Sequence, residues 1–142
     1  MSHWKFCRIG RTYSFSAAHH LPLVVVPDVV SSARRTLEVF DHWSNRLDGW
    51  PLALAIQDGQ ESLPIPWKYI SAVFIAGSTE FKMSRHAEHV VRAAKALDKW
   101  VHVGRVNTPD RWEYFEKMGA DSIDGSGIGR YSHMRADIKK KV

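Results

Sequence analysis

Short apolar runs alternate with amphipathic segments along the chain after residue 22. Five runs have the length and the apolar content of buried strands: "LVVVP" (23–27), "PLALAI" (51–56), "AVFIAG" (72–77), "WVHVG" (100–104) and "DSID" (121–124). Each run ends in, or is followed directly by, a proline, a glycine or a polar residue, which marks the start of a turn. The pattern predicts five strands.

The segments between these runs carry helical spacing and helix start signals. Ser31 and Ser32 precede one apolar stripe, formed by Ala33, Leu37, Phe40, Trp43 and Leu47. Ser84 precedes a second stripe, formed by Ala87, Val90, Val91, Ala94 and Leu97. Thr108 and Pro109 mark the start of a third helix that ends at Gly119, and "PWKYI" (66–70) predicts a single helical turn.

Strands that alternate with helices in this way predict an α/β fold of parallel βα units with right-handed crossovers. Two architectures fit: an open doubly wound sheet, and part of a (β/α)₈ barrel. A complete barrel takes about 250 residues for its eight strands. With about five strands in 142 residues, this chain does not close such a barrel by itself.

Composition narrows the class of protein. A chain of 142 residues that is 44% hydrophobic is long enough for one domain with a core. No apolar run approaches the roughly 20 residues that span a bilayer, and the first twenty residues lack the apolar centre of a secretory signal. Cys7 is the only cysteine, so a reducing, cytoplasmic location is expected. The net charge of +5 fits a polyanionic partner.

The chain divides into three parts that differ in amino-acid composition and pattern. Residues 1–22 are rich in histidine, serine and aromatic residues and belong to no βα unit. Residues 23–135 hold the βα units, and residues 136–142 form a basic tail that contains "KKK". We therefore expect an atypical N-terminal segment, a (β/α) domain and a solvated tail.

Polar residues and a glycine follow the predicted strands. In both architectures ligands bind at the carboxyl ends of the strands, where Asp28, Gln57, Gly77, Arg105 and Asp124 lie. Carboxylate, amide and glycine backbone groups together could hold a planar heterocycle such as guanine, with Asp124 facing the attached sugar. A carboxylate in that position can attack an anomeric carbon. The alternative for each residue is a purely structural turn.

Residues 24–135 resemble the deoxypurine-in-DNA transglycosylases, relatives of the tRNA-guanine transglycosylases. The matching stretches are "VPDVV" (26–30), "LAIQDGQE" (54–61), "VFIAGSTEFKMS" (73–84), "KWVHVGRVNTPDRWEYFEKMGADSIDGSG" (99–127) and "RYSHM" (130–134). The resemblance implies a partial TIM barrel of about five strands whose N-terminal half is missing. It also implies exchange of guanine in DNA for a 7-deazaguanine such as preQ0.

The resemblance assigns roles to individual residues. Asp124 matches the nucleophile, which would form an aspartyl glycosyl-enzyme; Asp28, Gln57 and Gly77 match base-binding residues. Arg105 and Arg130 lie where they could meet phosphate. The implied partners are DNA rather than tRNA and a 7-deazaguanine co-substrate, with no metal or organic cofactor. The chain lacks the three zinc cysteines of the tRNA enzymes and the "DSG"-like loop that carries the family's general base.

Two other functions remain open at this stage. The missing general base favours a catalytically incomplete remnant or partner subunit that binds a base or a nucleic acid. Residues 13–21, "YSFSAAHHL", resemble the opening strand of the 6-pyruvoyl-tetrahydropterin synthases, which implies a zinc enzyme with His19 or His20 as ligand. A five-stranded parallel sheet also leaves edges to be paired, so we expect self-association or a partner chain that completes the barrel.

Histidines and tryptophans outside these motifs have simpler interpretations. His86 and His89 are expected on the polar face of their helix, because the apolar stripe runs along its other side. His102 alternates with valines and is expected to be a hydrogen-bonded core residue. The tryptophans are expected mostly to pack helices against the sheet.

Overall fold

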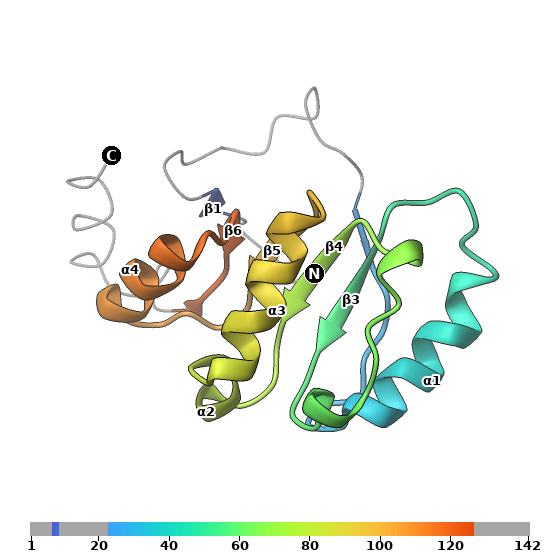
Figure 1. Cartoon of the computed structure of the whole chain (residues 1–142), viewed down its shortest axis with the longest axis horizontal. Coiled ribbons are helices and arrows are strands. Elements are labelled where there is room, and N and C mark those ends of the chain that lie inside the picture. Colours follow the sequence, from blue (N-terminus) through green and yellow to red (C-terminus); the bar gives the residue numbers. More distant parts are fainter. Residues whose placement is uncertain (1–6, 9–22, 127–142) are drawn as a thin grey trace.

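A six-stranded sheet organises the chain. The computed structural model describes residues 7–8 and 23–126 (Figure 1). Five strands run parallel: β2 (Val24–Val25), β3 (Leu52–Ile56), β4 (Ala72–Ile75), β5 (Trp100–Val103) and β6 (Ser122–Ile123). The two-residue strand β1 (Cys7–Arg8) pairs antiparallel with β6.

The strand order distinguishes the two predicted architectures. Neighbours in the sheet follow the order β1-β6-β5-β4-β3-β2, so the parallel strands lie side by side in the order in which they occur in the chain. A doubly wound sheet reverses its order at a switch point, which this sheet does not do. The five parallel strands curl into a half-barrel with helices between them, which confirms the α/β partial barrel.

Three helices of at least ten residues lie between successive strands: α1 (Ala33–Ser44), α3 (Arg85–Ala96) and α4 (Pro109–Met118). Each begins where the sequence predicts, because Ser32, Ser84 and Thr108 accept a hydrogen bond from a backbone N–H in the first turn. Gly119 ends α4 in the left-handed conformation, with φ 104°.

Shorter elements fill the remaining connections. The predicted turn at 66–70 is a 3₁₀ helix, η2 (Trp67–Tyr69), and it is preceded by η1 (Gln60–Ser62). The four-residue helix α2 (Thr79–Lys82) precedes α3. Neither η1 nor α2 was predicted, because elements of three or four residues are too short to show periodicity. The crossover from β3 to β4 therefore carries only 3₁₀ turns.

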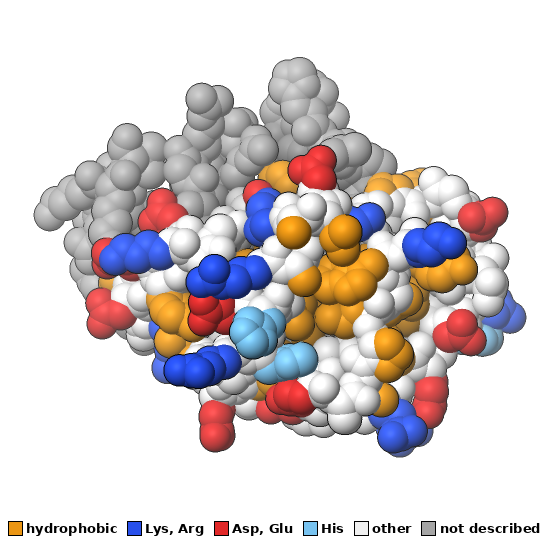
Figure 2. Space-filling model, in the orientation of Figure 1, with side chains coloured by type: hydrophobic (Ala, Val, Ile, Leu, Met, Phe, Trp, Pro, Cys, Tyr) orange, Lys and Arg blue, Asp and Glu red, His pale blue; other side chains and the backbone are white. Residues whose placement is uncertain are grey.

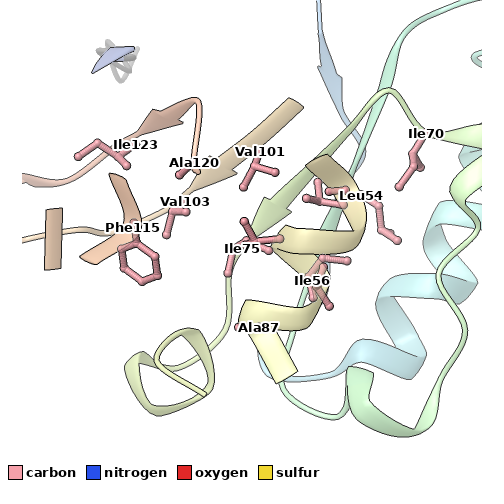
Figure 3. Packing of buried hydrophobic residues seen from close by; sticks show 14 of the residues in the cluster. Leu54, Ile56, Ile70, Ile75, Ala87, Val101, Val103, Phe115, Ala120 and Ile123 are labelled. Carbon is pink, nitrogen blue, oxygen red and sulfur yellow. The ribbon is translucent and has the colours of Figure 1, made fainter. Parts of the chain in front are cut away.

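The hydrophobic core lies between the helices and the outer face of the sheet. Alternate strand residues contribute to it, among them Leu54, Ile56, Ile75, Val101 and Val103, and each is at most 1% exposed (Figure 3). The residues between them point to the inner face of the half-barrel. The inner face of β5 and its neighbours carries the polar network described below.

The prediction for the tryptophans is only partly correct. Trp112 of α4 is buried in the core, whereas Trp50 is 54% exposed. Trp50 precedes β3, beside the crossover that has no long helix to cover it. Within residues 7–8 and 23–126, no helix is long and apolar enough to cross a bilayer.

Candidate functional site

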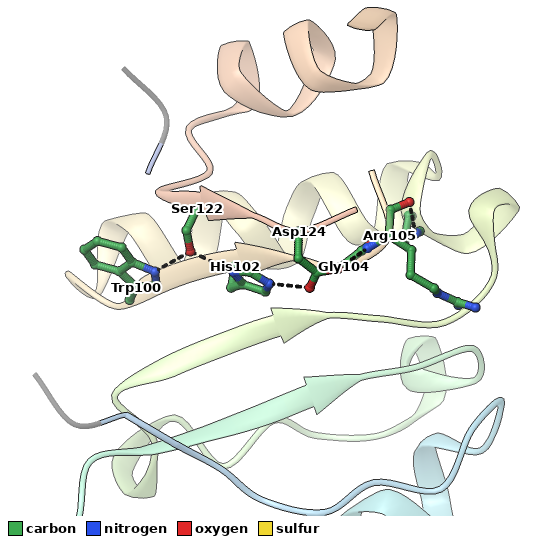
Figure 4. A network of polar contacts seen from close by, with 7 residues as sticks. Trp100, His102, Gly104, Arg105, Ser122 and Asp124 are labelled. Atoms are coloured by element: carbon green, nitrogen blue, oxygen red, sulfur yellow. Dashed lines mark hydrogen bonds and ion pairs between the residues drawn. The ribbon is translucent and has the colours of Figure 1, made fainter. Parts of the chain in front are cut away.

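A chain of hydrogen bonds runs along the inner face of β5 and β6 (Figure 4). The indole Nε1–H of Trp100 donates to the Ser122 hydroxyl over 2.8 Å, and that hydroxyl lies 2.8 Å from His102 Nδ1. His102 Nε2 lies 2.8 Å from Asp124 Oδ2. Because the indole can only donate, a tautomer of His102 with its proton on Nε2 satisfies every link: Ser122 donates to Nδ1, and Nε2 donates to Asp124.

Packing holds the imidazole of His102 in place. The ring stacks on Phe74 of β4 with centroids 4.9 Å apart and planes 8° from parallel. His102 is 3% exposed and Ser122 is 3% exposed. The expectation of a hydrogen-bonded, buried histidine is confirmed, and its partners are the Ser122 hydroxyl and the Asp124 carboxylate.

Asp124 lies at the carboxyl end of β6 and is 7% exposed. Its Oδ1 accepts the backbone N–H of Arg105 over 2.9 Å, and its Oδ2 accepts from His102. Burial acts to raise the pKa of this carboxyl. The hydrogen bonds from His102 and from the backbone N–H of Arg105, together with the positive charge of Lys82, outweigh burial and lower that pKa below its ordinary value of 3.8. Asp124 is therefore a fixed negative charge at neutral pH.

Arg105 lies in the turn that follows β5. Arg105 has φ 55°, an uncommon backbone conformation for a residue with a side chain. Lys82 Nζ supports the turn by donating to the carbonyl oxygens of Gly104 at 2.6 Å and Arg105 at 3.3 Å. The Arg105 side chain is exposed and donates from Nη2 to the Gly77 carbonyl over 2.6 Å. The turn thus joins the ends of β4, β5 and β6.

The Asp58 carboxylate lies so close to position 77 that only glycine fits there. Its carboxylate accepts the backbone N–H of Ser78 at 2.7 Å and the Ser78 hydroxyl at 2.6 Å. A Cβ at Gly77, where φ is 79°, would lie 2.5 Å from Asp58 Oδ2. Burial acts to raise the pKa of Asp58, but its hydrogen bonds to Ser78 and the charge of Arg105 lower it overall.

Asp28 and Gln57 meet at the other side of the same edge. Gln57 is 1% exposed; its Nε2 donates to Asp28 Oδ2, and its Oε1 accepts the backbone N–H of Ser31 over 3.3 Å. Ser31 has φ 60°, so Gln57 holds a strained turn ahead of α1. The amide of Gln57 is thus engaged within the protein, while Asp28 is exposed.

The predicted site residues therefore form two groups. Asp28 and Gln57 are joined by a hydrogen bond at β2 and β3, and Gly77, Arg105 and Asp124 are joined through the Arg105 turn. Within residues 23–126 no hydrogen bond or ion pair joins a member of one group directly to a member of the other, but Asp58, next to Gln57, accepts hydrogen bonds from Ser78, next to Gly77. Arg130 lies outside the described residues, as do His19, His20 and the basic tail.

Sequence reasoning missed three members of this site. Asp58 follows Gln57 directly in "QDGQE" and could have been found as a second polar residue at the same strand end. Lys82 and Ser122 gave no such signal, because their roles depend on contacts with residues at least 20 positions away. In the described part of the chain, no three histidine, cysteine, aspartate or glutamate side chains gather as a metal site would require.

Comparisons with known proteins do not assign this site. No family model matches the sequence, and no curated protein matches it. One similar solved structure is the PaMucR phosphodiesterase in complex with c-di-GMP, with a TM-score of 0.44 and 16% identity over 76% of this chain and 46% of that one. Another is the EAL enzyme Bd1971 in a cGMP-bound form, with a TM-score of 0.47 and 18% identity over 75% of this chain and 32% of that one.

The two similar structures match this chain over only part of their own length. The chain spans less than half the length of either similar structure. At such TM-scores and identities, neither structure assigns a ligand or a reaction to this chain.

The comparisons also correct the functional prediction. The similar structures are described as a phosphodiesterase and an EAL enzyme, and nothing found points to the transglycosylases. The resemblance to the deoxypurine-in-DNA transglycosylases is therefore wrong, and with it guanine exchange in DNA through Asp124. The alternatives, a base-binding remnant and a pterin-synthase-like zinc enzyme, do not match either. Barrel-type strands share a layout of polar residues at their ends, which makes short stretches alike across unrelated families.

Proposed function

We propose that the carboxyl edge formed by β4, β5 and β6 binds a small polar molecule, with Asp124 as its anionic anchor. The observation that supports this proposal is the hydrogen-bonded network that begins at Trp100 and continues through three buried side chains, those of Ser122, His102 and Asp124. A chain of buried polar groups is costly to build and is not needed to hold a parallel sheet together. It ends at the edge where ligands of (β/α) folds bind.

The charge state of Asp124 favours one kind of chemistry. A carboxyl whose pKa is lowered is a poor proton acceptor at neutral pH but a strong acceptor of hydrogen bonds. Each of its oxygens makes one hydrogen bond within the protein, which leaves a lone pair on each for a ligand. Asp124 is therefore suited to bind an N–H group or a positive charge.

Arg105 favours a negatively charged group on the ligand, whereas Asp124 favours a positive one. Its guanidinium is exposed and uses Nη2 for the Gly77 carbonyl, while guanidinium groups carry five N–H donors in all. Its other donors suit a carboxylate or phosphate. The ligand class is thus a small molecule with an amine or amide N–H and an anionic group, such as an amino acid or a phosphorylated amine.

The test is a binding screen on the full chain, by ligand-observed NMR and calorimetry, with amino acids, amino-sugar phosphates and phosphorylated amines. We expect at least one of these classes to bind the wild-type protein. Because a hydrogen bond to a charged group contributes about 1.5–3 kcal/mol, Asp124→Asn should weaken that binding about 10- to 100-fold. Arg105→Gly keeps the left-handed turn and the N–H to Asp124, and it should weaken binding of anionic members only.

The matched control is Asp98→Asn. Asp98 is exposed, has φ 56° and precedes β5 at the opposite end of the sheet, and asparagine tolerates that conformation. This variant should bind as the wild type does. The proposal is overturned if no class binds, or if Arg105→Gly and a folded Asp124→Asn both bind every ligand with wild-type affinity.

A further inference from the structure

A wide groove lies at the opposite end of the sheet from the candidate site. It has a volume of about 1120 Å³ and extends between the second half of α1 and the segment 64–71. Leu52 at the start of β3 lines it, as do Ser71 and Lys99, which precede β4 and β5. This position makes the groove independent of the ligand site at the carboxyl ends.

The groove exists because the outer layer lacks a helix. The other crossovers between parallel strands place α1, α3 or α4 against the sheet, whereas the β3–β4 crossover provides only η1 and η2. Three side chains of the core, Phe40, Leu52 and Ile70, therefore line the groove, although each is only 2–4% exposed. Figure 2 shows a further patch of hydrophobic side chains on the other side of the 57–71 crossover, between it and α3, so apolar surface is exposed there as well.

Two large aromatic residues stand at this groove. Trp50 is 54% exposed and Tyr69 is 68% exposed, and both line it. An exposed tryptophan and an exposed tyrosine beside an apolar depression are the residues most often found at the centre of protein interfaces. Both are exposed residues of the groove itself, so one copy of the surface offers both large aromatic side chains and a recess.

The charged residues of the groove lie on two sides, one acidic and one basic. The acidic side consists of Asp41 and Asp48, at α1 and the loop after it, and the basic side consists of Lys68 and Lys99. A two-fold symmetric contact brings each residue of a patch against the residues across the axis. A patch with an acidic side and a basic side is therefore complementary to itself.

We propose that this groove is the interface of a two-fold symmetric homodimer. Trp50 and Tyr69 of each copy pack into the groove of the other, and the acidic side of one copy faces the basic side of its partner. The apolar contact provides the affinity, whereas the charges provide the register, because exposed ion pairs contribute little net energy.

Light scattering and sedimentation of the full chain test the proposal. At about 50 µM, a concentration suited to micromolar association, we expect a dimer. Trp50→Lys should give a monomer. Reversal of the acidic side, with Asp41→Lys and Asp48→Lys, should also give a monomer, because two basic sides then face each other. Reversal of the basic side, with Lys68→Glu and Lys99→Glu, should do the same.

Mixing the two reversed variants distinguishes this interface from every other. An all-basic groove and an all-acidic groove should form a heterodimer that neither variant forms with itself. Glu38→Lys, an exposed change on α1 outside the groove, is the matched control and should leave the dimer intact. A monomeric wild type, a dimer that persists in Trp50→Lys, or failure of the two reversed variants to associate while both remain folded by circular dichroism would each overturn the proposal.

Discussion

Gly125 shows how a single residue is determined by a backbone contact. It follows Asp124 in "DGSG", where closely spaced glycines mark a turn. The structure gives another reason: a Cβ at Gly125 would lie 2.1 Å from the Val106 carbonyl oxygen. Val106 donates its N–H to the Asp124 carbonyl over 2.7 Å, so the two loops are held together there. The glycine positions Asp124 rather than exposing it.

Gly125→Ala should therefore destabilise the fold. The added methyl group forces the 104–107 and 124–126 loops apart, at a cost of about 1–3 kcal/mol, and urea unfolding measures it. Gly49→Ala is the comparison, since a Cβ there meets nothing within 4 Å and only its φ of 82° opposes the change. That variant should lose about 1–2 kcal/mol, the cost of the left-handed conformation for a residue with a Cβ, and less than Gly125→Ala loses. Equal losses in the two variants would refute a role for the Val106 contact.

At the scale of elements, Lys82 joins helix α2 to the end of strand β5. Its ammonium group is buried and bonds to two carbonyl oxygens of the Arg105 turn. Burial lowers the pKa of Lys82 from 10.5 to about 8; the positive charges of Arg105 and Arg111 add to that effect, while Asp124 opposes it. The short helix α2 thus carries a group whose protonation is coupled to folding.

The sign of that coupling follows from the direction of the shift. The folded protein releases this proton near pH 8, whereas the unfolded chain holds it until about 10.5. The unfolded state therefore binds more protons between these values, and the free energy of unfolding should gain a rising contribution there. Urea unfolding of the wild type and of Lys82→Met measures this effect. The free energy of unfolding of the wild type, relative to that of the variant, should rise between about pH 8 and about pH 10.

Lys117→Met serves as the control for this measurement. Lys117 lies on α4 with its side chain 75% exposed, where it pairs with Glu113. Its stability profile should run parallel to that of the wild type. If the profile of Lys82→Met is also parallel to the wild-type profile, the coupling between α2 and β5 is not electrostatic.

At the scale of the whole molecule, one core joins the elements. The buried cluster contains Phe40 of α1, Val90 of α3 and Phe115 of α4 together with residues of β3 to β6. No break in this cluster separates one half of the βα units from the other. A domain held by one continuous core unfolds as one unit.

Far-UV circular dichroism and tryptophan fluorescence should accordingly report the same urea midpoint. Helix content depends on α1, α3 and α4, whereas fluorescence depends on tryptophans such as Trp100 and Trp112 at β5 and α4. Both signals should also shift together in Leu54→Ala, which removes a core side chain that is 1% exposed and should cost about 2–5 kcal/mol. Separate midpoints for the two signals would contradict a single cooperative unit.

The sequence by itself determined the five parallel strands and the three main helices. Ser32, Ser84 and Thr108 cap the three main helices as predicted, and the five apolar runs are the five parallel strands, because caps and apolar periodicity depend only on neighbours within a few positions. It also placed Asp28, Gln57, Gly77, Arg105 and Asp124 at strand ends. It could not decide what those residues contact, and the function that it suggested for them is wrong.

The tertiary structure alone decided those contacts. Asp124 is linked to His102, Arg105 and Lys82, and the amide of Gln57 is taken up by Asp28 and Ser31. The strand order, the left-handed turn at Arg105 and the groove left by the missing helix also emerge only in three dimensions. The physical reason is the same for each: hydrogen bonds between strands and the shape of a surface depend on residues about 20 or more positions apart, which local pattern does not relate.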